Sequence, residues 1–143
     1  MLNNIDIRSE DYIFNMILLA FVLNYAAYFA EIFRGGIESI PKGQYEAAGA
    51  LGFGKAQTFF RVILPQVVKR VVPASSNEII TLVKDTSLAS AIPYMEIMYI
   101  AKKQVPTYAS LLPLFIAGIF YFVIATVLTV VFSAVEKKLD YYK

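Results

Sequence analysis

Residues 104–135 contain no charged side chain, and this run constrains the fold more than any other feature of the sequence. Within it, residues 111–134 are dense in Leu, Ile, Val and Phe, with Gly118 and Thr126 as small or weakly polar interruptions. A helix of about 20 apolar residues is long enough to cross the hydrocarbon core of a bilayer. The run therefore predicts a membrane-spanning helix over about residues 108–134.

A second apolar stretch covers residues 13–30, where Asn15 and Asn24 stand among apolar and aromatic residues. At a helical rise of 1.5 Å per residue this stretch reaches about 27 Å, close to the hydrocarbon thickness of about 30 Å. It predicts another membrane-spanning helix over about residues 12–33.

The composition excludes most enzyme chemistry. The chain is 58% hydrophobic and 17% charged, whereas soluble domains average about 45–50% and about 25%. It has no cysteine and no histidine, so it offers no Cys or His nucleophile, no disulfide and no zinc site of the usual ligands. A net charge of +2 gives no reason to expect nucleic acid as a partner. No cofactor is predicted.

The basic residues predict the topology, because cytoplasmic loops collect Lys and Arg near the ends of spans. They gather after the first span and after the last one, at Arg34, Lys42, Lys55, Arg61, Lys69, Arg70, Lys137, Lys138 and Lys143. Two flanks on one side require an even number of crossings between them, so the ambiguous stretch 66–92 should cross as well. We expect an all-α, polytopic membrane helix bundle with about three transmembrane helices, in which the acidic N-terminal segment lies outside the cell.

Turn residues divide the region between the first two spans. Gly35 and Gly36 should end the first helix, and Pro41 can begin a short helix that stops at Gly52 and Gly54. A second helix over residues 55–64 should then stop at Pro65. Residues 37–65 therefore predict a cytoplasmic helix-turn-helix element, here named the coupling region; an amphipathic hairpin lying on the headgroups is the alternative.

The motifs of this region resemble a known signature. Glu46-Ala47-Ala48, three residues, Gly52, nine residues and then Val62-Ile63-Leu64-Pro65 closely resemble the cytoplasmic signature of permease subunits of ATP-binding-cassette (ABC) importers, with Val62 where Ile is usual. The stretches 27–37 (AYFAEIFRGGI), 39–44 (SIPKGQ) and 84–88 (KDTSL) look like the polar amino-acid permeases of the histidine and glutamine type.

The resemblance implies that the coupling region docks on a cytoplasmic ATP-binding subunit through Glu46, Ala47, Ala48, Gly52, Leu64 and Pro65. It also implies an extracytoplasmic solute-binding protein, a homo- or heterodimeric permease partner, an amino-acid substrate and surrounding membrane lipid. ATP hydrolysis would occur on the partner, and the chain has no phosphate-binding P-loop of its own. Members of this family resemble five-span proteins, so the chain is expected to begin after the first two spans.

Several polar residues are expected at membrane depth, where an ionisable group costs at least about 2.5 kcal/mol and usually faces a bundle interior or a solute path. The spacing of Ser75, Glu78, Thr81 and Asp85 places them on one helix face. With Thr86, Ser87 and Asn24 they are candidates for a translocation path. Two simpler interpretations stay open, a helix interface and a Lys84–Asp85 pair, while Glu31 is expected to pair with Arg34.

The sequence thus predicts a permease subunit of an ATP-driven amino-acid importer in the cytoplasmic (inner) membrane. The alternative is a non-transporting membrane scaffold or a truncated permease relic. An intramembrane hydrolase is disfavoured, because a serine type lacks a histidine and an aspartyl type needs a second aspartate within a span.

Overall fold

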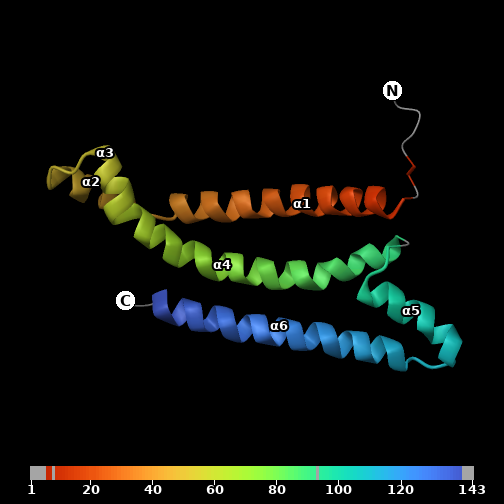
Figure 1. The fold of residues 1–143 in the computed structure, drawn as a ribbon. Coiled ribbons are helices and arrows are strands. Elements are labelled where there is room, and N and C mark those ends of the chain that lie inside the picture. Colours follow the sequence, from red (N-terminus) through yellow and green to blue (C-terminus); the bar gives the residue numbers. More distant parts are fainter. Residues whose placement is uncertain (1–5, 8, 93, 140–143) are drawn as a thin grey trace. The chain divides into compact units, whose positions relative to one another are not determined.

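The computed structural model describes residues 6, 7, 9–92 and 94–139, and the described residues form helices and turns without any strand (Figure 1). In chain order these are α1 (Glu10–Glu38), α2 (Lys42–Ala50), α3 (Lys55–Thr58), a π-helical turn (Phe59–Ile63), α4 (Leu64–Asp85), a 3₁₀ segment (Thr86–Ala91), α5 (Ile97–Tyr108) and α6 (Leu112–Leu139). The fold class is therefore all-α, as predicted.

Among the described residues, α1 and α6 are the helices long and apolar enough to cross a membrane. Their most apolar windows have mean hydropathies of 1.8 and 2.6, and only 6% of each window is buried within the chain. Large apolar side chains such as Leu23 and Phe122 are more than half exposed, as expected for helices that meet lipid or other spans. α4 does not reach this hydropathy, so a crossing by α4 stays a prediction.

The chain divides into two compact units. Unit 1 comprises residues 1–26 and 80–128, and unit 2 comprises residues 27–79 and 129–143. Unit 2 contains the coupling region and a hydrophobic core formed by Ile40, Ile63, Val67 and Val71, against which Ile32, Phe59 and Val62 pack. Ile63, from the motif that ends at Pro65, is fully buried at 0% exposure.

The prediction that Gly35 and Gly36 end the first helix is wrong, because α1 continues through both to Glu38. Gly36 is buried where α1 meets α4, and a Cβ atom added to it would lie 2.3 Å from Cγ2 of Val71. The glycine thus permits close packing of two helices. The helix ends slightly later, where the Ser39 hydroxyl donates to the carbonyl of Gly36 at 2.7 Å and Pro41 cannot continue the backbone hydrogen bonds.

The predicted stop at Pro65 is also wrong. α3 continues through the π-helical turn into α4, and Pro65 is the second residue of that helix. A proline removes a backbone donor and crowds the carbonyl four residues earlier, and the wider hydrogen-bond spacing of a π-helical turn accommodates such a residue. The ribbon accordingly coils without a break from α3 into α4 (Figure 1).

Two other predicted boundaries shift. The stretch 66–92 is not one regular helix, since α4 ends at Asp85 and a 3₁₀ segment follows. The Thr86 hydroxyl there donates to the carbonyl of Val83 at 2.7 Å and competes with the helical pattern. The last helix extends beyond residue 134 to Leu139 and starts at Leu112 instead of residue 108. Its start is later because an additional helix that was not predicted, α5, occupies residues up to Tyr108 and is followed by the left-handed residue Ala109 (φ 46°).

Replacing Gly36 by Ala is expected to destabilise unit 2 by about 1–3 kcal/mol, the usual effect of overpacking a close contact. The matched control is Gly35→Ala, because a Cβ atom at Gly35 meets nothing within 4 Å. The measurement is the thermal unfolding midpoint of the purified protein in detergent.

A compensating variant sharpens this test. Val71→Ala removes the Cγ2 atom that the new Cβ would meet, so Gly36→Ala should cost less in the Val71→Ala background than alone. Equal midpoints for Gly36→Ala and Gly35→Ala would refute the close approach of α1 and α4.

Candidate functional site

The coupling region is built around α2 and the turn that follows it. The N–H groups of Gly52 and Phe53 donate to the carbonyls of Gly49 (2.9 Å) and Ala48 (3.0 Å), the paired bonds of a Schellman helix end. That motif needs a left-handed residue after the C-cap, and Gly52 has a φ of +79°. The glycine of the signature is thus required by backbone geometry.

The signature residues of α2 face two different ways. Glu46 and Ala47 are exposed, whereas Ala48 is buried at 3% exposure. At the other end of the region Leu64 is half-buried and Pro65 is exposed. Ala48 therefore packs within the chain, while Glu46 and Ala47 lie on the exposed side of α2.

Polar contacts join the coupling region to α4. The Gln66 side-chain amide donates to Oε1 of Gln44 at 3.4 Å and to the carbonyl of Val62 at 2.8 Å. The Arg70 guanidinium donates to the carbonyl of Ser39, just after α1. Together with the buried core around Ile63, these bonds hold α2 and the first turns of α4 as one packed body.

Gly52→Ala is expected to destabilise the turn after α2 by on the order of 1 kcal/mol, because a non-glycine residue in the left-handed region is strained. Gly52→Asn should cost less, since Asn tolerates this conformation. The measurement is the rate of limited proteolysis in residues 51–54 of the detergent-purified protein.

Gly43→Ala is the matched control, because Gly43 lies inside α2 and a Cβ atom there meets nothing within 4 Å. It should slow proteolysis or leave it unchanged. Equal effects of Ala and Asn at position 52 would contradict a conformational role for Gly52.

In unit 2, α4 carries the candidate path residues Ser75 and Glu78, both half-buried. The Ser75 hydroxyl oxygen is buried and makes no hydrogen bond with any described residue. Its neighbour Ser76 instead donates to the carbonyl of Val72 at 2.8 Å, next to Pro73 inside the helix. Ser76 thus bonds back to its own helix, whereas Ser75 does not.

In unit 1, Asp85 accepts a hydrogen bond from the Tyr25 hydroxyl at 2.7 Å. No ion pair joins Asp85 to Lys84 in the described part of the chain, so the predicted Lys84–Asp85 pair is wrong and a neutral donor from α1 takes that place. Thr81 and Thr86 are exposed, and Ser87 is half-buried. Asn24 is exposed on α1, although its neighbour Tyr25 is buried, so they point to different sides of the helix.

The Glu31–Arg34 pair is confirmed. The two side chains approach to 2.5 Å, and both are more than 60% exposed. An exposed pair three residues apart on a helix stabilises it by a few tenths of a kcal/mol. Glu31 is therefore engaged near the C-terminal end of α1.

Sequence reasoning missed Glu96. Its carboxylate caps α5 by accepting the N–H groups of Met98 (2.8 Å) and Tyr99, and it also accepts the Tyr121 hydroxyl of α6 at 3.0 Å. An acidic side chain is favourable at a helix N-terminus, but Glu is not among the residues preferred at the N-cap position, so the local signal for this cap was weak. The Tyr121 partner lies 25 residues away and left no such local signal.

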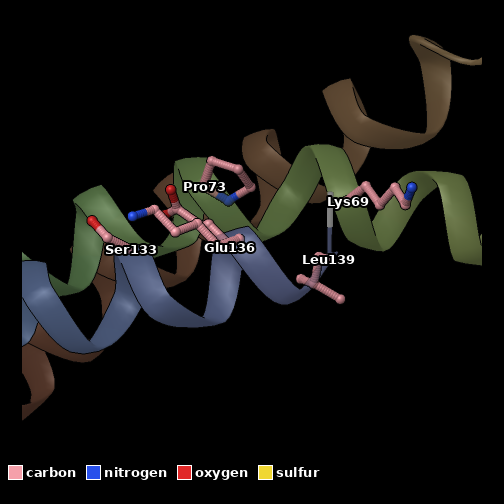
Figure 2. A pocket seen from close by; sticks show the side chains of 6 residues that line it. Lys69, Pro73, Ser133, Glu136 and Leu139 are labelled. Atoms are coloured by element: carbon pink, nitrogen blue, oxygen red, sulfur yellow. The ribbon is translucent and has the colours of Figure 1, made fainter. Parts of the chain in front are cut away.

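A cavity of about 390 Å³ lies within unit 2 between α4 and α6 (Figure 2). Lys69 and Pro73 come from α4, and Ser133, Glu136, Lys137 and Leu139 come from α6. Its lining combines both signs of charge with apolar atoms where the apolar run of α6 ends. This composition suits the polar boundary of a span.

The described residues hold no group of three or more acidic side chains that could bind a metal ion. Among them, α2 presents the exposed side chains of Glu46 and Ala47, a hydrogen bond joins α2 to α4, and two carboxylates accept from tyrosine hydroxyls. Such an arrangement can bind, transmit movement and accept hydrogen bonds.

Comparisons with known proteins bear on this arrangement. The family described as binding-protein-dependent transport system inner membrane component matches residues 5–141. The octopine transport system permease protein OccM of Rhizobium radiobacter is 42% identical over 120 residues, covering 83% of this chain and 49% of the relative. The arginine transport system permease protein ArtQ of Bacillus subtilis is 43% identical over 123 residues, covering 85% of this chain and 56% of the relative.

A solved structure is also similar. The crystal structure of an amino acid ABC transporter with histidines matches with a TM-score of 0.72 and 35% identity, covering 80% of this chain and 54% of that one. The chain spans about half the length of the curated relatives it matches.

Proposed function

The chain belongs to the family of binding-protein-dependent transport system inner membrane components, and on this premise we propose that it is the membrane-spanning permease subunit of an ATP-driven importer of polar amino acids. The observation that carries the proposal is an exposed Glu46–Ala47 face on a helix that is bonded to α4. Relatives named for octopine and arginine transport support an amino-acid substrate. A non-transporting scaffold is not favoured by any of these matches.

The protein is an inner-membrane protein and not itself an enzyme, as its permease relatives indicate. Hydrolysis of ATP would take place on a separate cytoplasmic subunit. An extracytoplasmic solute-binding protein would deliver the amino acid, and a second permease subunit, identical or related, would complete the path.

The topology is part of the proposal. α1, α4 and α6 would each cross the membrane, with the coupling region and the basic C-terminal end in the cytoplasm. The density of Lys and Arg after α1 and α6 supports this orientation. α4 could cross despite its lower hydropathy, because its half-buried polar residues would face other spans and not lipid.

The proposed mechanism begins at α2. Closure of the ATP-binding subunits would move the exposed face around Glu46 and Ala47, while Gly52 sets the direction of the following turn. Because Ala48 and Ile63 are buried in the same unit, α2 would not move independently of the start of α4 at Leu64 and Pro65. The force would therefore reach the span directly.

The amino acid would pass along polar groups on α4, on the 3₁₀ segment and on α1. Hydroxyls and carboxylates suit a zwitterionic solute, because they accept hydrogen bonds from its ammonium group and donate to its carboxylate. The proposed path residues are Ser75, Glu78, Thr81, Asp85, Thr86, Ser87 and Asn24.

Ala47→Trp is expected to leave the thermal midpoint nearly unchanged, because Ala47 is exposed, and to abolish co-purification of the ATP-binding subunit and solute uptake. A bulky side chain there would keep the docking surface from closing. The measurements are co-purification from membranes and uptake into proteoliposomes that contain the reconstituted complex.

Two variants serve as controls. Ala48→Trp places the same bulk at a buried position and should lower the thermal midpoint, so it reports misfolding. Lys55→Trp is exposed and lies outside the signature, and it should preserve both assembly and uptake. Normal assembly and uptake by Ala47→Trp would refute the docking assignment.

A further inference from the structure

Tyr25 stands out because a buried phenol of α1 reaches a carboxylate that lies 60 residues further along the chain. Tyr25 is 6% exposed, and Asp85 is half-buried. The phenol oxygen is 2.7 Å from Oδ2 of Asp85, a normal length for an O–H···O bond. Both residues belong to unit 1, so the contact is part of one packed body.

The kind of donor decides what the carboxylate can still do. A lysine or arginine partner would cancel the charge of Asp85, whereas a phenol donates a hydrogen bond and leaves the negative charge in place. Within the described part of the chain, the Asp85 carboxylate accepts one side-chain hydrogen bond, which runs from the Tyr25 hydroxyl to Oδ2. Asp85 therefore keeps an acceptor oxygen and its charge.

Asp85 lies at the junction between an α-helix and a 3₁₀ segment. It is the last residue of α4, and the 3₁₀ segment begins at the next residue. As the N-cap residue of that segment, Asp85 makes no capping hydrogen bond with its side chain. A bond from α1 restricts it, and the stacking of Tyr25 on Phe21, with ring centroids 6.2 Å apart, holds the phenol itself.

We propose that Tyr25 is a positioning residue, which fixes the Asp85 carboxylate so that its free oxygen and uncompensated charge receive the cationic nitrogen of the transported amino acid. This inference rests on the proposed function, in which Asp85 belongs to the translocation path. Tyr25 itself would not touch the solute.

The test uses the complete complex reconstituted in proteoliposomes, with arginine as the probe, and measures KM and kcat for uptake. Tyr25→Phe removes only the hydroxyl and should raise KM roughly tenfold, since a hydrogen bond to a charged group is lost, with little change in kcat. Tyr12→Phe is the matched control, because Tyr12 is a half-buried tyrosine on the same helix, and its KM should stay at the wild-type value.

A double-mutant cycle separates positioning from general stability. Asp85→Asn should raise KM at least as much as Tyr25→Phe, and the double variant should be no worse than Asp85→Asn alone. If Tyr25→Phe raises KM by the same factor with or without Asp85→Asn, Tyr25 acts independently and the positioning role is overturned.

The remaining outcomes distinguish this inference from the proposed function. If Asp85→Asn raises KM and Tyr25→Phe does not, the positioning role is wrong and the path assignment stands. If Asp85→Asn leaves KM unchanged while arginine is still taken up, Asp85 is outside the path, and both the assignment and the positioning role fail. A lower thermal midpoint for Tyr25→Phe with unchanged KM would also overturn the proposal, because it would show a purely structural bond.

Discussion

The close approach of α1 and α4 at Gly36 is the constraint on which unit 2 depends. The absence of a side chain at Gly36 lets Val71 come within a distance that no Cβ atom would tolerate, and Val67 and Ile63 follow it into the core. Ala48 of α2 is also buried, and α2 is bonded to α4 through Gln44. If the two long helices were held further apart, this core would be disrupted, although the residues of α2 would be unchanged.

The partners of the carboxylates differ with the exposure of each carboxylate. Glu31 is exposed and paired with Arg34, so its charge is largely cancelled where water already screens it. Asp85 and Glu96 are half-buried. Asp85 accepts a hydrogen bond from the hydroxyl of Tyr25 on α1, and Glu96 accepts one from the hydroxyl of Tyr121 on α6. Neutral donors lower the cost of burying a carboxylate without removing its charge.

Short sequence patterns predicted the features that depend on residues close together in the sequence. The apolar runs of α1 and α6, the short helix α2 and the glycine turn at Gly52 follow from hydropathy and turn chemistry over a few residues. The same rules misassigned Gly36, because a glycine that ends a helix and one that admits a neighbouring helix look alike in a sequence. Only the position of Val71, 35 residues later by number, distinguishes them.

In the candidate site, too, features set by neighbouring residues were predictable and features set by distant residues were not. The signature around Glu46 was recognisable because its spacing is fixed by one helix and one turn, whereas capping by Glu96 left only a weak local signal. The Tyr25 and Tyr121 contacts could not be predicted, since they join residues that are 60 and 25 positions apart in the sequence. The burial of Ala48 beside the exposed Ala47 was equally hidden, because it depends on which face of α2 meets the core.

The continuity from α3 into α4 bears on how movement could travel. A helix that stopped at Pro65 would place a flexible joint between the docking face and the span, and displacement of α2 would be absorbed there. The π-helical turn instead accommodates Pro65 without interrupting the helical path, and the bonds of Gln66 and Arg70 brace its first turns. Pro73 is the next place where the backbone hydrogen bonding of α4 is broken, and Ser75 and Glu78 follow it directly. A displacement entering at α2 would therefore be transmitted along α4 as far as Pro73, where the helix can bend just before the residues proposed to line the path.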